Sequence, residues 1–434
     1  MRGTRGEDFM LAIQHAASPS YTPNFRFQTS LMLLRIIATV AGVLLAGVAF
    51  GQDAATRAGE AERQRADKAA QLKPRPPNKV EAVLFRIEDH YLPERIFNPP
   101  RGLFVRAGGM SEGQGIKAGP AFRLSNYDTS FTATSVVSIR GAWEVTGRLD
   151  FPRPTLEPPP RYFSVGAVRH RLPQEDFWGF GIDAPEEART NYLLDETTVD
   201  VTAGLNPTDW LAFSAAAEYR AERPGAGKDP NFPSTGLIDS DVPGITDDVD
   251  YVRMGGGVGL DLRVAREGTP VGGWYNVSFN RYVDQTLDRF SFNRLDADVQ
   301  QYIPIFTSAR LIALHAHLTS TVPDEGHAVP IYMQPTIGGS HSVRGYRVSR
   351  FRDQNSLLLQ AEYRYQLNAF MTGSLFYDAG TVAAERHKLN LHDTKTDYGF
   401  ALRFGFAALI GMRAEIVLGG DEGTVYALRF GDVF

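Results

Sequence analysis

The sequence predicts an all-β protein, a transmembrane antiparallel β-barrel of about sixteen strands formed by residues 101–434. From Gly102 onward, apolar residues recur at every second position, and clusters of Gly, Pro, Asn and Asp separate the runs. The connections between runs are alternately long and short, and an apolar run near the N-terminus has the features of an export signal. These observations disfavour the two or three soluble domains that a chain of this length would otherwise suggest.

The composition excludes several functional classes. The chain contains no cysteine, which rules out disulfides, thiolate chemistry and zinc sites built on cysteine. Its formal net charge is only -5 and no face is rich in Lys or Arg, so we expect no nucleic-acid partner. No Ser–His–Asp arrangement stands out, and we expect neither an enzymatic activity nor a cofactor.

Residues 1–51 are interpreted as a cleaved signal peptide. The apolar run from Ile36 to Val48 is too short to cross a membrane as a helix, and small residues follow it at the cleavage-determining positions. A start at Met32 would give the usual short basic n-region, which favours Met32 as the true start. The alternative is an uncleaved anchor, and N-terminal sequencing of the exported protein decides between the two.

Two short segments are expected between the signal peptide and the barrel. Residues 52–78 are interpreted as a polar periplasmic linker, because they contain almost nothing to bury and end in a Pro-rich stretch. Residues 79–100 are expected to form a short amphipathic periplasmic helix, since apolar residues between Val80 and Leu92 recur at helical spacing. Its apolar face would dock on the periplasmic rim of the barrel; a marginally formed, undocked helix is the alternative.

The alternation is clearest between Ser356 and Leu367. The apolar residues of this run share one face: Leu357, Leu359, Ala361, Tyr363, Tyr365 and Leu367. Glu362 and Arg364 lie on the opposite face, and we expect both to point into a polar lumen and to support what lies there. Because a soluble antiparallel sheet also alternates, the connections between strands supply an independent test.

The lengths of the connections indicate the two ends of the barrel. The expected strands begin near Arg101, Lys117, Ser130, Ala142, Arg161, Thr190, Thr208, Val249, Gly272, Phe292, Ser308, Asn355, Phe370, Thr396, Met412 and Thr424. The long connections all follow odd-numbered strands: His170–Arg189, Arg220–Asp248, Thr321–Gln354 and Gly380–Lys395. Turns after even-numbered strands are mostly short, and Phe151 to Pro160 is the longest. Long extracellular loops and short periplasmic turns produce this asymmetry, which predicts a bacterial outer-membrane location with both termini in the periplasm.

A loop motif carries a family resemblance. Residues 337–346, with the sequence IGGSHSVRGY, resemble the sixth-loop motif of the BamA/TamA superfamily, the outer-membrane insertases and two-partner secretion transporters whose barrel is also called the bacterial surface antigen domain. The motif residues are Gly338, Gly339, Val343, Arg344, Gly345 and Tyr346. Residues 351–353 and 375–380 are similar to segments that follow the motif in the family, and residues 176–181 (DFWGFG) to a further barrel signature. The resemblance covers about Gly102 to Phe434.

The position of Asp378 predicts a partner in that loop. Leu375 and Tyr377 fall on the lipid face of their strand, so Asp378 faces the lumen, where an unpaired carboxylate shielded from water would be costly. An arginine folded inward offers a bidentate, charge-assisted partner, and the resemblance implies that it is Arg344. We therefore expect the loop Thr321–Arg350 to dip into the barrel and to be latched by Arg344 to Asp378, with Gly338, Gly339 and Gly345 permitting positive φ. The alternative is an extracellular cap in which Arg344 is solvated.

Other polar clusters are interpreted as loop or lumen residues. An acidic loop contains Asp239, Asp241, Asp247, Asp248 and Asp250, but the spacing does not match a calcium loop. His387, His392 and Asp393 lie in a long predicted loop, so we expect no metal site there. His315 and His317 share the lumen face of one strand and are expected to be hydrogen-bonded there.

Two classes of function follow from the resemblance. The first is a barrel that assists insertion or translocation of polypeptides, with a seam between the strands near Arg101 and Thr424 as a further hypothesis. The second is a stand-alone surface antigen or plugged pore with a structural or small-solute permeability role. Residues 79–100 are far too few for the periplasmic polypeptide-binding domains that the family usually carries, so the means of client capture stays open. The expected partners are outer-membrane lipids and, in the first case, client polypeptides or other assembly proteins.

Overall fold

The computed structural model describes residues 99–110, 113–154, 159–266, 269–305, 307–368, 371–404, 412–430 and 433–434. All of them belong to the second of two compact units into which the chain divides, Pro77–Phe434. The predicted signal peptide, the linker and the helix between Val80 and Leu92 lie outside the described residues.

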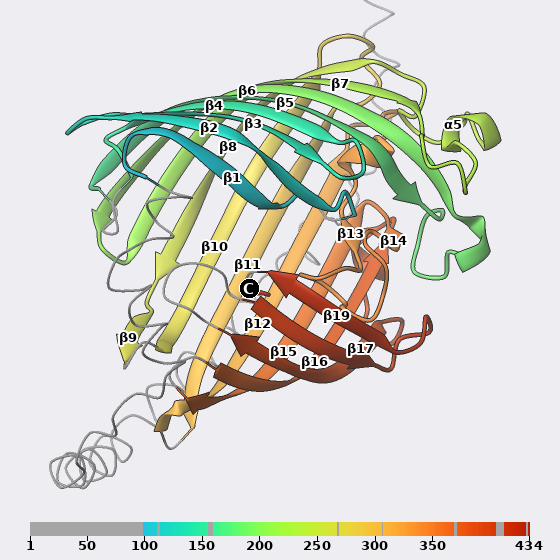
Figure 1. Cartoon of the computed structure of the whole chain (residues 1–434). Coiled ribbons are helices and arrows are strands. Elements are labelled where there is room, and N and C mark those ends of the chain that lie inside the picture. The colour runs from blue at the N-terminus through green and yellow to red at the C-terminus, as the bar shows by residue number, and fades with distance from the viewer. Residues whose placement is uncertain are drawn as a thin grey trace, which may run out of the picture. The chain divides into compact units, whose positions relative to one another are not determined.

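The described part of the chain is an antiparallel sheet in which each strand pairs with the next along the sequence (Figure 1). The strands are β1 Gly102–Gly109, β2 Ile116–Ser125, β3 Ser130–Ser138, β4 Trp143–Phe151, β5 Arg161–Phe177, β6 Thr190–Thr208, β7 Leu211–Ala226, β8 Val249–Asp261, β9 Val264–Arg266, β10 Thr269–Asp284, β11 Phe292–Ile305, β12 Thr307–Pro323, β15 Asn355–Asn368, β16 Met371–Ala383, β17 Lys395–Phe404, β18 Met412–Leu418 and β19 Val425–Phe430. Because β8 and β9 both pair with β10, they form one interrupted strand. The prediction of an all-β fold with sixteen antiparallel strands is therefore confirmed.

In the described part of the chain, helical structure is confined to single turns in the connections. These are α5 Thr235–Ile238 and the 3-10 turns Glu186–Ala188, Ile331–Met333 and Arg386–Lys388. Within the described residues, no helix has the length and apolar character needed to cross a membrane.

Side chains of the strands alternate between a convex and a concave face. On β16, Leu375 and Tyr377 are more than half exposed, whereas Phe376 and Asp378 are buried. The same period appears on β15, where Gln360 and Glu362 are buried between half-buried or exposed neighbours. The convex face thus presents an apolar surface suited to lipid, and the polar residues point to the concave side.

The connections differ in length as predicted, although the strands before the long connections are longer than expected, β5 and β7 most of all. β5 continues to Phe177 and β7 to Ala226, so the loops that follow them are residues 178–189 and 227–248 rather than His170–Arg189 and Arg220–Asp248. Residues 324–354 connect β12 to β15, and two residues, 209–210, connect β6 to β7. Strands that rise beyond the membrane-spanning length account for the difference, because period-2 alternation alone does not mark where the apolar band ends.

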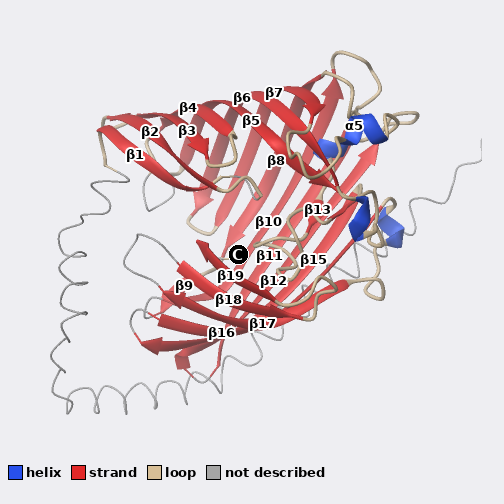
Figure 2. Ribbon diagram, turned by 45° about the vertical axis from the view of Figure 1, so that its right-hand side comes forward, coloured by secondary structure: helices blue, strands red, loops and turns tan. Residues whose placement is uncertain are grey.

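The sheet is strongly curved, and the connection between β12 and β15 lies on its concave side (Figures 1 and 2). This connection carries the two-residue strands β13, Thr336–Ile337, and β14, Phe351–Arg352, which pair with each other. The first and last strands of the large sheet are β1 and β19. Among the described residues, no ladder of hydrogen bonds joins these two strands. Closure of the sheet into a barrel accordingly stays a prediction.

Candidate functional site: the inward loop and the wall behind it

The candidate site is built on the connection between β12 and β15, hereafter the sixth loop, residues 324–354. Gly338 and Gly339 have φ values of +109° and +105°, which favour glycine. A Cβ at Gly338 would also lie 2.3 Å from the carbonyl oxygen of Arg347, so the turn can close only around a glycine. This tight turn directs the following residues, 340–346, against the strands.

Gly345 is needed for a different reason from the one that the sequence suggested. Its φ is not among the positive values, so the expectation of a left-handed conformation there is wrong. A Cβ on Gly345 would lie 3.0 Å from the Cβ of Asp397 on β17, and the Gly345 N–H donates to Asp397 Oδ2 at 2.6 Å. The glycine allows the loop backbone to lie directly against the sheet.

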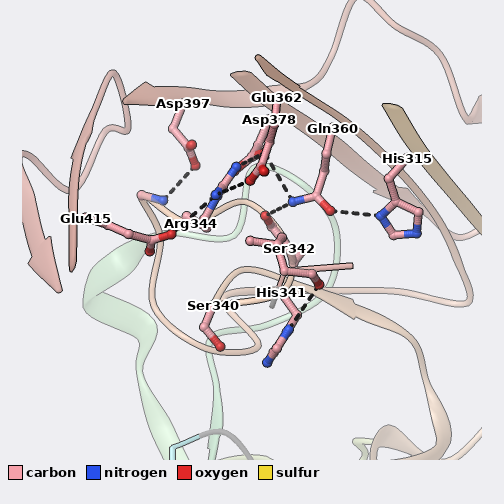
Figure 3. A network of polar contacts seen from close by, with 12 residues as sticks. His315, Ser340, His341, Ser342, Arg344, Gln360, Glu362, Asp378, Asp397 and Glu415 are labelled. Atoms are coloured by element: carbon pink, nitrogen blue, oxygen red, sulfur yellow. Dashed lines mark hydrogen bonds and ion pairs between the residues drawn. The ribbon is translucent and has the colours of Figure 1, made fainter. Parts of the chain in front are cut away.

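Arg344 enters a fully buried cluster of carboxylates (Figure 3). Its Nε donates to Asp378 Oδ2 at 2.6 Å and its Nη2 to Asp378 Oδ1 at 2.9 Å, a bidentate arrangement. Its Nη1 donates to Glu362 Oε1 at 2.8 Å and to Glu415 Oε1 at 3.3 Å. The guanidinium also lies 3.5 Å from the centroid of the Phe376 ring. Every face of the guanidinium is therefore occupied by a fixed partner.

The carboxylates come from three strands and are balanced by further arginines. Glu362 lies on β15, Asp378 on β16 and Glu415 on β18, each at a buried position of the alternation. The other arginines that pair with them belong to the same strands or their neighbours: Arg364 and Arg403 to Glu362 at 2.7 and 2.6 Å, and Arg413 and Arg429 to Glu415 at 2.5 and 3.3 Å. Removal of one member of a buried ionic network leaves uncompensated charge, which typically costs about 3–5 kcal/mol.

A polar chain extends the cluster to His315 of β12 (Figure 3) and from there to Asp298 of β11. Gln360 Nε2 donates to Asp378 Oδ1 at 3.1 Å and to the Ser342 carbonyl at 2.9 Å. The Gln360 Oε1 lies 2.9 Å from His315 Nδ1, and His315 Nε2 lies 3.1 Å from Asp298 Oδ2. His315 is thus buried and hydrogen-bonded, as expected, while His317 stacks on it with ring centroids 6.3 Å apart.

The remaining motif residues form the apolar side of the site. Val343 is fully buried and Tyr346 nearly so, in a cluster with Ile337 and Phe351 of the loop and two residues of the sheet, Leu358 and Val382. Tyr346 contacts Phe351 edge to face, with centroids 5.2 Å apart. The loop therefore packs on β15 and β16 through an apolar cluster as well as through Arg344.

The upstream segment that resembles a barrel signature also contacts the sixth loop. The Gly181 N–H donates to the Arg352 carbonyl at 2.9 Å, and Arg350 Nη2 donates to the Ala184 carbonyl at 2.8 Å. Trp178 is fully buried and lies 5.5 Å from the guanidinium carbon of Arg350. The two segments that the resemblance singled out, about 160 residues apart in sequence, are thus neighbours.

The acidic loop and the loop histidines have other partners. Asp248 and Asp250 pair with Arg223, at 3.6 and 2.5 Å, and Asp247 pairs with Arg289 at 2.7 Å. His387 Nδ1 lies 3.3 Å from Glu385, and both side chains are exposed. Within the described ranges, no group of three His, Asp or Glu side chains has an arrangement suited to a metal ion.

The loop leaves part of the concave side open. A cavity of about 450 Å³ lies between the sixth loop and β7, β10, β11, β12 and β15. Its lining is polar on both sides, with Arg220, Arg294 and His317 from the strands and Gln334 and His341 from the loop.

Several residues of the site were not expected from the sequence. The cluster is completed by Glu415, Asp397, Arg413 and Arg429. In the sequence, only the opposite charges of Arg413 and Glu415 at i, i+2 on one strand could have indicated part of it. The alternation predicted an inner position for Glu362 and Arg364 but gave no information on what they bond.

Comparison with known proteins finds a family domain that covers part of this arrangement. Residues 244–414, which contain the sixth loop and β15 to β17, match the Omp85 superfamily domain. No curated protein sequence matches the chain. The crystal structure of BamA from Haemophilus ducreyi lacking POTRA domains 1–3 has a similar fold, with a TM-score of 0.54 and 13% identity over 76% of this chain and 69% of that one.

Two further solved structures are CdiB proteins. CdiB from Acinetobacter baumannii has a TM-score of 0.47 and 13% identity over 75% of this chain and 58% of its own, and CdiB from Escherichia coli has a TM-score of 0.48 and 11% identity over 76% and 60%. This chain therefore covers 58–69% of the length of these three solved chains. The sixth-loop motif lies inside residues 244–414, the part of the chain that matches the Omp85 superfamily domain, and the described residues share the fold of BamA.

Proposed function

We propose that the chain is a bacterial outer-membrane barrel that assists insertion or translocation of polypeptides, and that Arg344 and Asp378 form the latch that keeps its sixth loop inward. The observation that carries the proposal is the fully buried, bidentate Arg344–Asp378 pair at the centre of the family motif. The match of residues 244–414 to the Omp85 superfamily domain supports the polypeptide-handling role, and the apolar convex face supports the membrane location.

The geometry of the Arg344–Asp378 pair suits such a role. Arg344 is more weakly hydrated than a lysine would be and presents a planar fork to Asp378, so the pair holds one loop geometry rather than several. The termini would both lie in the periplasm if the long connections face outward, and the inward loop would then extend from the extracellular side into the lumen.

Charge exchange tests the latch. Arg344→Glu places a fourth carboxylate beside Asp378, Glu362 and Glu415, and we expect loss of function in a cell that depends on the protein. The double variant Arg344→Glu with Asp378→Arg restores one opposite-charge pair and should recover part of the function. Arg347→Glu serves as the matched control, because Arg347 is on the same loop and its side chain is 47% exposed. Equal activity of Arg344→Glu and the control would contradict the proposal that Arg344 and Asp378 form a functional latch.

A second candidate function is a plugged barrel with a structural or permeability role. The occupied concave side favours it, since the sixth loop fills much of that space and leaves a cavity of about 450 Å³. Depletion of the protein discriminates between the two candidates. Loss of several other barrels from the outer membrane supports polypeptide handling, whereas an unchanged set of membrane proteins with altered uptake of small solutes supports the plugged pore.

A further inference from the structure

A cavity on the concave face carries polar groups that the proposed latch does not use. It is the cavity of about 450 Å³ between the sixth loop and the strands, hereafter the loop cavity. Arg294 and Asp296 of β11 and Tyr282 of β10 line it from the sheet, and Tyr332 and Gln334 line it from the loop. Sites for small molecules are typically cavities of roughly 300–1,000 Å³ in which a few polar groups converge. The loop cavity has the size and the kind of lining that such a site needs.

Arg294 is held in place but has no anionic partner. Its Nη2 donates to the Met333 carbonyl in the sixth loop, and its Nε donates to Thr321 Oγ1 at 3.4 Å. Its guanidinium carbon lies 5.5 and 5.4 Å from the ring centroids of Tyr282 and Phe292. Among the described residues, no carboxylate forms an ion pair with this guanidinium, and its Nη1 meets no acceptor. Nη1 is therefore available to an anion, and the planar guanidinium suits a carboxylate or a phosphate.

The second arginine at the loop cavity is already neutralised. Arg220 on β7 pairs with three carboxylates, those of Glu218, Glu196 and Glu222, at 2.7, 3.0 and 3.3 Å. Three carboxylates around one guanidinium leave no excess of positive charge there, so an added anion is repelled. The positive charge that a ligand can use is that of Arg294.

The sixth loop contributes two polar groups that lack a partner. Gln334 is only 8% exposed, and its Nε2 donates to the Val329 carbonyl at 2.9 Å. Within the described part of the chain, neither the Gln334 Oε1 nor the buried hydroxyl of Tyr332 has a hydrogen-bond partner. Asp296 accepts from Thr319 Oγ1 through its Oδ1, at 2.8 Å, which leaves its Oδ2 for a further donor. Because buried polar groups are nearly always hydrogen-bonded, Gln334 and Tyr332 point to partners from outside the chain.

These groups select for one ligand chemistry. Arg294 requires an anion, whereas the Gln334 Oε1 and the Asp296 carboxylate require donors. The Tyr332 hydroxyl can donate or accept. An anion without hydroxyls would bond Arg294 but would leave acceptors facing acceptors at Gln334 and Asp296. A sugar that carries a carboxylate or a phosphate meets every requirement, because each of its hydroxyls both donates and accepts.

We propose that the loop cavity binds an anionic sugar, a carbohydrate unit that carries a carboxylate or a phosphate. Arg294 bonds the anionic group through Nη1, and Gln334 and Asp296 accept from the sugar hydroxyls. Because Arg294 belongs to β11 and Gln334 to the sixth loop, the bound sugar joins the loop to the wall. The inference goes beyond the proposed function and does not depend on polypeptide handling.

Saturation-transfer NMR of the folded protein in micelles tests the site. The folded form is identified by its faster migration before boiling. The probes are glucuronate and glucose-6-phosphate, with neutral glucose for comparison and inorganic phosphate as a competitor. We expect at least one anionic sugar to bind about tenfold more tightly than glucose, because it gains one charge-assisted contact. The tighter of the two probes distinguishes a sugar acid from a sugar phosphate.

Two results would overturn the proposal. One is the absence of binding by both anionic sugars, or binding no tighter than that of glucose. The other is displacement of the bound sugar by inorganic phosphate at the same concentration, which would show an anion site without selectivity for a sugar.

Variants locate the binding in the loop cavity. Arg294→Gln removes the charge but keeps a donor for the Met333 carbonyl, and it should weaken binding of the anionic sugar about tenfold with little effect on glucose. Arg169→Gln on β5 is the matched control, because Arg169 is 59% exposed and does not line the cavity.

Tyr332→Phe provides a second variant that leaves the charge unchanged. It removes a hydroxyl that has no partner among the described residues, so we expect the protein to fold and binding to weaken about two- to tenfold. This variant decides the question alone if Arg294→Gln fails to fold. Binding that is unchanged in Arg294→Gln and Tyr332→Phe, or weakened equally in Arg169→Gln, would contradict the proposal.

Discussion

Two parts of the sheet differ in what packs against their inner side: the C-terminal wall, strands β15 to β18, and the N-terminal wall, strands β1 to β4. Behind the sixth loop, β15 to β18 carry carboxylates with no exposed side-chain surface, paired with Arg344. In β2 to β4, the ion pairs Lys117–Glu144 and Arg148–Asp150 are partly open to water. β1 is the extreme case, because Phe104 is its one buried residue.

This difference shows that period-2 alternation alone does not predict which part of the sheet is shielded from water and stabilised by a packed loop. Both walls follow the same period-2 rule, but on the C-terminal wall the sixth loop packs over the buried carboxylates and excludes water from them. Electrostatic contacts strengthen as water is removed, so the sixth loop and β15 to β18 should behave as one stable unit. The N-terminal wall, with fewer buried contacts, should open at lower cost.

The largest expected effect concerns Arg344. Arg344→Ala leaves Asp378, Glu362 and Glu415 without their shared cation, and we expect a loss of about 3–5 kcal/mol in the free energy of unfolding. Urea unfolding in lipid vesicles measures it. Arg347→Ala, whose side chain is half exposed, should change the same quantity by no more than about 1 kcal/mol. Equal losses would show that the C-terminal wall does not depend on the buried cluster.

An intermediate effect is expected at the close approach of loop and sheet. Gly345→Ala introduces a Cβ at 3.0 Å from Asp397 and strains the hydrogen bond from the Gly345 N–H, at a cost of about 1–3 kcal/mol. Gly108→Ala on β1 is the control, since no atom lies within 4 Å of its added Cβ. The same unfolding measurement compares them, and a larger cost at Gly108 would reverse the contrast between the walls.

The smallest effect is expected at the water-exposed start of the sixth loop. Hydrogen bonds from Arg281 hold the pKa of Asp324 below its ordinary value. Its stabilising contribution is therefore present above the ordinary carboxyl pKa and is lost as the pH falls through the lowered one. Asp324→Asn should remove this dependence, with a change of a few tenths of a kcal/mol, because the pair is accessible to water. Unfolding curves of the two proteins between about pH 2 and pH 6 test it.

The sequence predicted the strands and one half of the site. Period-2 alternation located Asp378 and Glu362 on the inner face, and the motif indicated Arg344. It gave no sign that Glu415, 71 residues after Arg344, is a partner of this arginine, because a period reports the face of a residue and not its partner on another strand. The role of Gly345 was missed for the same reason, since its neighbour Asp397 is defined only by packing.

The end of the chain shows the same limit. The alternation of apolar residues at Tyr426 and Leu428 indicates a strand but not what Phe434 contacts. The structure places Phe434 on His315 of β12. A contact that crosses the interior depends on the curvature of the sheet, which the sequence pattern of one strand does not contain.

Hydrogen–deuterium exchange of the folded protein in vesicles tests the central claim most directly. The account holds that residues 340–346 are as firmly held as the wall behind them, because Arg344 and Gly345 bond to buried carboxylates. We predict that amides of 340–346 exchange as slowly as those of β16 and more slowly than those of β1. Exchange of this segment at the rate of the exposed connection at residues 386–394 would contradict the account.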